Sequence, residues 1–316
     1  MMLTKTKMLS AVITLLMTGI AGAETLHIGA LPAADSIVLY TAQEEGLFKS
    51  QGLDVEVIPF KSALEIGAAM RAGKLQGHFG DLMNVLSQNA RGVPQAVILT
   101  TTHSSPEQRN FAMVTSPQKA SSIKSVKDLH HTDSAMSSST IIDYLLDRMS
   151  QEEKLPADAL NRQEVKQIPI RLQMLLSGKT DTCLLPEPLV SVVEVKGGRV
   201  IWDDRKLDEA QAVVALRREV LSEKTVSSFR AAVAQAAKLI ESDPEKYRAV
   251  MVQKGLLPKP VASSYKMVRF SLFKTADGLP PLPTSDEVKR VGDWMIAHKM
   301  LQTLPAYDDV VVASKP

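Results

Sequence analysis

The sequence predicts an α/β fold in which mostly parallel sheets are covered by helices on both faces. Two patterns indicate this. Short apolar runs, such as residues 25–30 and 95–101, have the length and composition of buried strands. Segments with apolar residues at helical spacing, such as residues 63–72, lie between them. Strands that alternate with helices pair in parallel because each helix carries the chain back to the same end of the sheet.

The first group of predicted elements lies between residues 25 and 101. The expected strands are 25–30, 53–58, 77–80 and 95–101, and the expected helices are 36–49, 63–72 and 81–91. Asp81 stands at the start of the last helix, where an aspartate side chain can cap free backbone amides.

A second alternating group follows, and the chain then becomes mostly helical. The expected strands are 110–115, 133–136, 164–168, 182–185, 200–202 and 212–216, with helices over 138–149, 170–177 and 189–195. The later helices are expected at 219–241, 244–254, 261–270 and 285–298, and a proline-rich loop at 280–283 separates the last two.

A faint internal repeat links the two groups. Residues 70–76 and 175–181 align at an offset of 105, and each contains a helix end, a glycine, a lysine and the entry to a buried strand. Glycine suits this position because the residue after a helix often adopts a positive φ. The repeat predicts two similar α/β lobes, although any helix-to-strand turn can look like this.

The composition excludes several classes of protein. The chain has 316 residues, of which 45% are hydrophobic and 23% charged, so it is not intrinsically disordered. The 37 basic and 35 acidic residues leave no basic excess for binding nucleic acid. The single cysteine excludes an internal disulfide framework and a cysteine-rich metal site. The length suggests about two domains.

Residues 1–23 have the pattern of a signal peptide. Lys5 and Lys7 precede an apolar run at 9–20, and Ala21-Gly22-Ala23 forms a site for cleavage before Glu24. The alternative is an N-terminal membrane anchor, for which the apolar run is short. No cysteine follows the run, so a bacterial lipoprotein is not expected. Removing the two lysines leaves 35 basic and 35 acidic residues, so we expect a soluble, nearly neutral exported protein.

The chain resembles type II periplasmic solute-binding proteins, in particular those of the nitrate/sulfonate/taurine and thiamine-pyrimidine-precursor type. The resemblance is best between residue 25 and about residue 202. The matching motifs are Ile28-Gly29, the EGLFK run at 45–49, the QGLDVEV run at 51–57, Ala72-Gly73-Lys74, the SGKTD run at 177–181 and Pro186-Glu187-Pro188.

This resemblance implies a two-lobe clamp with a hinge of two chain crossings, near 101–105 and 211–214. Lobe one would comprise 24–104 plus 212–316, and lobe two 105–211. A ligand would bind in the cleft, and the closed protein would dock on an ABC permease whose ATPase drives import. The protein would be a periplasmic monomer that meets the membrane only through the permease.

The cleft residues can be predicted from the fold alone. In open α/β sheets the ligand lies beyond the carboxyl ends of the strands, next to helix N-termini with unpaired amides. In the first group these positions are Asp35, Ser36, Phe60, Lys61, Ser62, Gly80, Asp81, Asn84, Thr102 and His103. In the second group they are Ser138, Ser139, Thr140, Arg171 and Glu187.

Each position also has a structural interpretation. Ser36, Ser62, Ser139 and Asp81 could be helix caps that touch no ligand. Phe60 could belong to the core, Lys61 could be solvated, and Glu187 could be an exposed acid in a turn. Acids and bases are balanced among these residues, and only 4% of the chain is aromatic. A small polar organic ligand with an amino or amide group is therefore expected, with no cofactor.

Catalytic and metal-binding motifs are not found. The six histidines lack metal-site spacing, and the His130-His131 pair with Asp133 fits an exposed loop better than a metal site. Gln173 replaces the first glycine of a phosphate-binding loop, and Cys183 lies in a predicted buried strand. Two alternatives remain open: an enzyme of the pyrimidine-synthase type on the same fold, and a binding subunit that serves a sensor.

Overall fold

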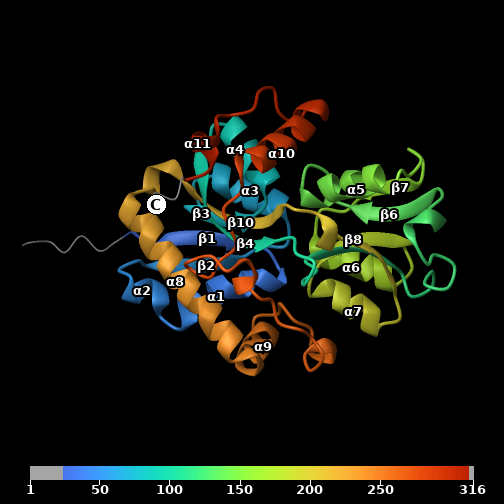
Figure 1. Cartoon of the computed structure of the whole chain (residues 1–316), viewed down its shortest axis with the longest axis horizontal. Helices are drawn as coiled ribbons and strands as arrows, with labels where there is room; N and C mark the ends of the chain where they lie inside the picture. Colours follow the sequence, from blue (N-terminus) through green and yellow to red (C-terminus); the bar gives the residue numbers. More distant parts are fainter. Residues whose placement is uncertain (1–23, 313–316) are drawn as a thin grey trace, which may run out of the picture.

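The structure, a computed structural model, describes residues 24–312. The predicted signal peptide, residues 1–23, lies outside the described residues. The described chain forms two five-stranded sheets, each flanked by helices (Figure 1). We refer to the sheets with their helices as lobe one and lobe two.

The sheet of lobe one has the order β2-β1-β3-β10-β4. Its strands are β1 (Leu26–Ala30), β2 (Val55–Pro59), β3 (Gly77–Gly80), β4 (Gln95–His103) and β10 (Ala210–Arg217). β1 pairs in parallel with β2 and β3, and β10 lies antiparallel between β3 and β4. β10 therefore returns from the far lobe into the middle of this sheet.

Helices from both ends of the chain cover this sheet (Figure 1). They are α1 (Ile37–Glu44), α2 (Leu47–Ser50), α3 (Ala63–Arg71), α4 (Leu82–Ala90), α8 (Glu223–Ser242), α9 (Pro244–Gln253), α10 (Ser285–Ala297) and α11 (Tyr307–Val310). α8 buries Phe229, Ala236 and Ile240 along one face, and the ring of Phe229 lies 4.8 Å from that of Phe48 at the end of α2. Burial of this apolar stripe fixes the long helix on the lobe.

The sheet of lobe two has the order β7-β6-β8-β5-β9. Its strands are β5 (Phe111–Thr115), β6 (Thr132–Met136), β7 (Leu160–Glu164), β8 (Thr182–Pro186) and β9 (Val200–Asp203), with α5 (Ile141–Glu152), α6 (Ile168–Leu176) and α7 (Leu189–Val195). β6 pairs in parallel with β7 and β8, and β5 is antiparallel to β8 and β9. Each lobe thus has a mixed sheet in which one strand, β10 in lobe one and β5 in lobe two, runs antiparallel to the other four.

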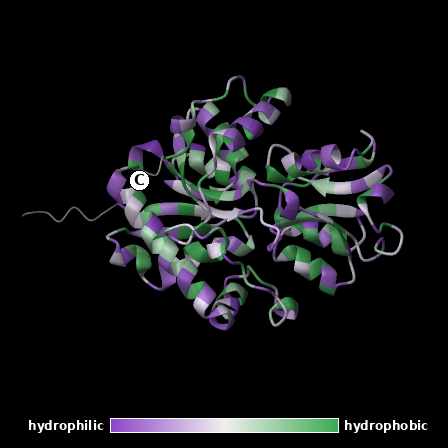
Figure 2. Ribbon diagram, in the orientation of Figure 1, coloured by the Kyte–Doolittle hydropathy of each residue, from purple (hydrophilic) through white to green (hydrophobic). Residues whose placement is uncertain are grey.

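Short 3-10 helices occur in the connections. They are η1 (Ala34–Ser36), η2 (Val126–Asp128), η3 (Asp204–Lys206), η4 (Arg218–Val220), η5 (Lys259–Val261) and η6 (Ser271–Phe273). Figure 2 shows that apolar residues gather on the strands and on the inner faces of the helices. In the described part of the chain, no helix is both long and apolar enough to cross a membrane.

Two chain segments connect the lobes, one between β4 and β5 and one between β9 and β10. They run side by side because Ser104 joins them. Its amide donates to the carbonyl of Glu209 at 2.9 Å, and its hydroxyl accepts the amide of Glu209 at 2.9 Å and donates to the carbonyl of Leu207. The two crossings therefore form one hydrogen-bonded unit.

The predicted two-lobe α/β fold with mostly parallel sheets is confirmed, and most predicted elements lie within a few residues of the observed ones. The two turns of the internal repeat also match in conformation, since Gly73 has φ +68° and Gly178 has φ +72°. Side chains rarely adopt this region, which explains glycine at both helix ends.

Two predicted elements are wrong. The strand expected at 164–168 lies earlier, at β7, because this exposed edge strand lacks an apolar alternation and Ile168 already begins α6. The helix expected at 261–270 is absent; η5 ends at Val261 and an irregular segment follows. Pro258 and Pro260 precede it, and the side chains of Tyr265 and Val268 are buried without helical geometry.

Replacing Ser104 by Ala should lower the free energy of unfolding by about 1–3 kcal/mol, because it removes the hydroxyl that joins the crossings. Urea denaturation measures this. Ser122→Ala is the control, since Ser122 is exposed and its hydroxyl contacts only the carbonyl of Lys119. Equal stability of both variants would contradict a structural role for the Ser104 hydroxyl.

Candidate functional site

A cavity of about 660 Å³ lies between the lobes, at the carboxyl ends of strands from both sheets. Lobe one contributes residues that follow β1, β3 and β4, and lobe two contributes residues that follow β6, β7 and β8. The irregular segment 264–269 forms a further part of the wall. The cavity therefore occupies the place that the sheet rule predicts for a ligand.

The cavity wall contains about half of the predicted site residues. Those in the wall are Asp35, Gly80, Asp81, Thr102, Thr140, Arg171 and Glu187. The wall does not include Ser36, Phe60, Lys61, Ser62, Asn84, His103, Ser138 or Ser139.

Three serines outside the wall were possible helix caps, and their polar groups have different structural roles. Ser62 caps α3 by accepting the amide of Glu65 at 3.2 Å. The hydroxyl of Ser36 donates to the carbonyl of Ala33 at 2.8 Å. Ser139 is exposed with φ 60°, and its amide donates to Asp143 at 3.1 Å. These polar groups are occupied by their own local structure.

Other predicted positions outside the wall support the lobes or the rim. Phe60 packs in a small core around Ile66 and Leu75. The backbone carbonyl of Lys61 accepts the amide of Ile168 at 3.1 Å, which joins the two lobes at the rim. Ser138 contacts Lys166, whose Nζ lies 2.9 Å from its hydroxyl.

The backbone amide of Asn84 donates a hydrogen bond to the Asp81 carboxylate at the start of α4. The side-chain Oδ1 of Asn84 is buried and has no hydrogen-bond partner among the described residues. Asn84 therefore contributes its backbone amide to the cap beside the cavity, and Asn84 is not among the residues of the cavity wall.

Asp81 joins the N-termini of two helices in different lobes. Its Oδ1 accepts the amide of Asn84 in α4 at 2.7 Å, and its Oδ2 accepts the amide of Ile141 in α5 at 3.0 Å. Burial raises the pKa of Asp81, and the two backbone amides oppose that rise. The carboxylate is thus both a cap for its own helix and a contact between the two lobes.

Glu187 is neutralised by protein groups. Arg109 Nη2 lies 2.6 Å from its Oε1, and the hydroxyl of Ser191 donates to its Oε2 at 2.9 Å. The same arginine also pairs with Glu194 at 2.7 Å. Burial alone would lower the pKa of Arg109, but the two carboxylates raise it. The backbone carbonyl of Glu187 accepts the amide of Ala34 at 2.8 Å, a further contact between the lobes.

Asp35 differs from these two carboxylates because no cation pairs with it among the described residues. It is 5% exposed in the wall of the cavity, and the hydroxyls of Thr101 and Thr102 donate to its Oδ2. Burial raises its pKa from 3.8 to about 6, although these hydroxyls oppose the rise. Asp35 therefore carries a poorly compensated charge at neutral pH.

Arg171 is the corresponding cation on lobe two. It is 1% exposed, and its Nη1 donates to the carbonyls of Val165 at 2.9 Å and Lys166 at 3.2 Å. Its Nε has no hydrogen-bond partner in the described chain, and burial lowers its pKa. Backbone carbonyls orient the guanidinium without neutralising it.

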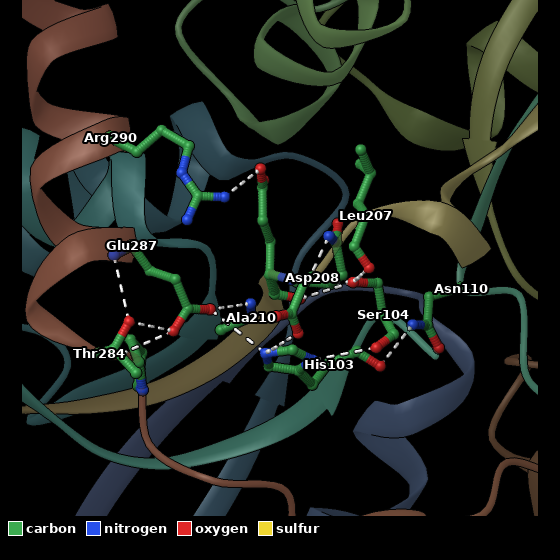
Figure 3. Close-up of polar contacts among 12 residues, drawn as sticks. His103, Ser104, Asn110, Leu207, Asp208, Ala210, Thr284, Glu287 and Arg290 are labelled. Atoms are coloured by element: carbon green, nitrogen blue, oxygen red, sulfur yellow. Dashed lines mark hydrogen bonds and ion pairs between the residues drawn. The ribbon is translucent and has the colours of Figure 1, made fainter. Parts of the chain in front are cut away.

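His103 lies at the end of β4, where the first crossing begins, and it contacts the second crossing and α10 (Figure 3). Its Nε2 lies 3.3 Å from Glu287 and 3.9 Å from Asp208, and its Nδ1 lies 3.0 Å from the carbonyl of Ser104. Burial opposes its charge, but Glu287 and the Ser104 carbonyl raise its pKa. Burial would raise the pKa of Glu287, but His103 and Thr284 lower it to about 2. The pair holds α10 against the first crossing.

Glu209 ties the second crossing to both lobes. Its carboxylate accepts a hydrogen bond from Tyr144 at 2.9 Å and pairs with Arg148 at 3.0 Å, both on α5. From lobe one, Arg290 on α10 approaches it at 2.8 Å. Figure 3 shows the Arg290 contact above the crossing. Glu209 therefore connects α5 of lobe two and α10 of lobe one to the backbone of the second crossing.

Sequence reasoning missed two groups of cavity residues. Arg109 lies on the first crossing, and its position next to a hinge was a signal that it could border the cleft. The segment 264–269, with Tyr265 buried in the wall, was interpreted as one face of a helix. Pro258 and Pro260, which precede this segment, are the sequence signal against a regular helix here.

Among the described residues, no group of three or more His, Cys, Asp and Glu is placed to hold a metal ion. Cys183 is fully buried, and burial raises its pKa to about 11, so its thiolate is scarce at neutral pH.

Comparisons with known proteins agree with the geometry. The family model described as "NMT1/THI5 like" matches residues 33–247. The aliphatic sulphonate binding protein SsuA from Escherichia coli has a similar structure, with a TM-score of 0.72 and 18% identity, covering 91% of this chain and 97% of that one. No curated protein matches the sequence.

Two further solved structures are similar. The alkanesulfonate-binding protein SsuA from Xanthomonas axonopodis pv. citri, bound to MOPS, has a TM-score of 0.71 and 17% identity over 92% of this chain and 97% of that one. A ligand binding component of an ABC-type import system from Staphylococcus aureus, with zinc bound, has a TM-score of 0.69 and 14% identity over 91% and 96%. At these identities the likeness shows the shared fold.

Replacing Asp35 by Asn should stabilise the ligand-free protein at neutral pH. The folded state binds the Asp35 proton more tightly than the unfolded state, so stability from this group falls as pH rises from about 4 to 6. Asn cannot ionise, so the variant should have a free energy of unfolding about 1–3 kcal/mol higher than the parent above pH 6. Urea denaturation at pH 7.5 and pH 4 measures it, and the gain should vanish at the lower pH.

The control for this prediction is Glu56→Gln, because Glu56 is an exposed carboxylate on β2 whose ion pair with His27 lies at the surface, where such a pair contributes little. It should leave the stability unchanged at both values of pH. If Asp35→Asn were destabilising at pH 7.5, the charge of Asp35 would already be compensated within the protein.

Proposed function

Because the chain belongs to the NMT1/THI5-like family, we propose that it is an exported solute-binding protein that delivers a small polar organic molecule to an ABC importer. The observation that carries this proposal is the 660 Å³ cavity enclosed between two lobes, with charged side chains from both lobes in its wall. Such a volume lies within the usual range for small-molecule sites.

Contacts between the lobes around the cavity support a clamp. Asp81 reaches the amide of Ile141, and Gln167 donates to Glu65 at 3.0 Å on another side. Ligand contacts with both lobes would add to these contacts and stabilise the closed form further. A ligand shifts such an equilibrium only by binding the closed form more tightly.

The cellular setting follows from the same proposal. Residues 1–23 would direct export, cleavage before Glu24 would release the protein to the periplasm, and the closed clamp would dock as a monomer on a permease with its ATPase. The named relatives of the same fold include periplasmic and import-system proteins, which supports this setting. N-terminal sequencing of the exported protein should begin at Glu24.

A binding role fits the described side chains better than catalysis. The thiol of Cys183 is buried and is not part of the cavity wall, and His103 is paired with Glu287 beside the first crossing. Burial lowers the pKa of His78 to about 4 inside the sheet. A pyrimidine-synthase-like enzyme would turn over its bound ligand, and a sensor subunit would bind it without supporting uptake.

The test of function is to identify what the protein binds and what that binding achieves. Small molecules released by unfolding gently purified protein are identified by mass spectrometry, and uptake of the labelled compound is measured with and without the gene. We expect an unaltered small polar molecule and uptake that requires the protein. Release of a converted product, or uptake independent of the gene, would reject the transport role.

Replacing Asp81 by Ser should weaken ligand binding by about tenfold while preserving the fold. Serine still caps α4 but is too short to reach the amide of Ile141, so one charged hydrogen bond of the closed form is lost. Calorimetry measures affinity, and small-angle scattering of the free protein should show more open molecules.

The matched control is Asp243→Ser. Asp243 caps α9 by accepting the amide of Lys246 at 3.1 Å, and α9 lies within lobe one. This variant makes the same chemical change at a helix cap that joins no second lobe, so affinity should be unchanged. Equal losses in both variants would mean that capping, and not contact between lobes, governs binding.

A further inference from the structure

The two lobes also contact each other away from the cavity, through α5 of lobe two and α10 of lobe one. The ring of Tyr144 on α5 lies 5.4 Å from the ring of Trp294 on α10, with 82° between the ring planes. Both residues belong to one hydrophobic cluster, which also contains Leu145 of α5 and Val291 of α10. The apolar core therefore continues from one lobe into the other at this place.

Polar contacts accompany the aromatic pair. The Nε1 of Trp294 donates to Oδ2 of Asp147 on α5 at 2.9 Å, and the Nε2 of His298 lies 3.0 Å from the same oxygen. Arg162 of β7 holds the other oxygen of Asp147 at 2.5 Å, which anchors this carboxylate within lobe two. Two ring nitrogens from lobe one thus meet a carboxylate that lobe two holds in place.

Glu209 provides a second carboxylate between the same two helices, because Tyr144 and Arg148 approach it from α5 and Arg290 approaches it from α10. Residues four apart lie on one face of a helix, so one face of α10 carries all of its contacts with lobe two. We refer to the side chains of the two helices that make these contacts as the α5–α10 interface: Tyr144, Asp147, Arg148, Arg290, Trp294 and His298.

Separation of the two helices would break contacts that water replaces poorly. Trp294 is 9% exposed in this arrangement and Glu209 is 4% exposed. Moving α10 away would uncover the indole ring and would remove Arg290 from the buried carboxylate. Buried aromatic pairs and hydrogen bonds to charged groups are among the stronger contacts in proteins, so both favour the lobes being together.

The interface is separate from the cavity. The wall that the described residues form includes Ile141 and Ile142 at the start of α5, but it includes none of the six interface residues. A molecule bound in the cavity would therefore not touch the interface. The interface can act on binding only through the relative position of the lobes.

We propose that the α5–α10 interface holds the two lobes together in the ligand-free protein, and that its side chains are positioning residues for ligand binding. The second part rests on the proposed function. The apparent affinity for a ligand that binds between the lobes is reduced by the fraction of molecules in the competent arrangement. By raising that fraction before a ligand enters, the interface sets the affinity without contacting the ligand.

Hydrogen exchange of the ligand-free protein, followed at individual amides by mass spectrometry, tests the proposal. Three backbone amides donate to an acceptor in the opposite lobe, those of Ala34, Ile141 and Ile168. These amides exchange faster when the lobes separate more often, even if the separated form is rare. The amides of β1 and β6 are paired within their own sheets and report the stability of each lobe.

Arg290→Met should speed exchange at the three amides between the lobes by about tenfold, because one charged hydrogen bond to Glu209 is lost. Exchange in β1 and β6 should be unchanged. The matched control is Lys289→Met, which removes a neighbouring positive charge on α10. Lys289 pairs with Asp293 of the same helix at 2.5 Å, so this variant should leave all of these rates unchanged.

Trp294→Phe tests the aromatic side of the interface. Phenylalanine keeps an aromatic ring against Tyr144 but lacks the Nε1 that donates to Asp147. The same three amides should again exchange about tenfold faster. Trp202→Phe is its control, because Trp202 is equally buried, at 9% exposure, but lies on β9 within lobe two. That variant should leave the three amides at the rates of the parent.

Unchanged exchange at the three amides in both Arg290→Met and Trp294→Phe would overturn the proposal. Equal acceleration in Lys289→Met would also overturn it, as would faster exchange throughout β1 and β6, which would indicate a loss of overall stability. No ligand is used in these measurements. Uptake that is independent of the gene would therefore reject the transport role and leave the result on the interface unchanged.

Discussion

The hydrogen bonds that join the two chain crossings determine how the rest of the molecule is arranged. Ser104 and Glu209 hold the crossings side by side, so the two lobes are joined through one hydrogen-bonded segment. The antiparallel pairing of β10 with β4 continues from that point into the sheet of lobe one. The strand ends of the two sheets consequently meet at one place, and the cavity forms between them.

Burial of charge in this cavity follows a consistent rule. Where a charge serves the protein, a protein group compensates it, as Arg109 does for Glu187 and as two helix N-termini do for Asp81. Asp35 and Arg171 have no ion-pair partner in the described chain. Burial raises the pKa of Asp35 and lowers that of Arg171, which in each case favours the neutral form. A free protein that keeps such groups is less stable than it could be, which is a common feature of binding sites.

The sequence predicted what depends on local pattern. The buried strands and the cap at Asp81 follow from apolar runs and from a short polar residue before a helix. What it could not predict depends on contacts distant in the chain. The segment 264–269 enters the wall through tertiary packing, and the exposed edge strand β7 has no apolar alternation. The choice between a helix cap and a cavity contact, as for Ser62 or Asp81, requires knowledge of the fold.

The complete burial of the sole thiol has a practical consequence. Cys183 lies within β8 at 0% exposure, and its pKa of about 11 keeps it in the unreactive thiol form. A pair of cysteines introduced at the rim, in place of Glu65 and Gln167, would then be the reactive thiols of the folded, described chain. Fluorescent dyes or a trapping crosslink placed there would report the movement of the lobes without labelling the native sulfur.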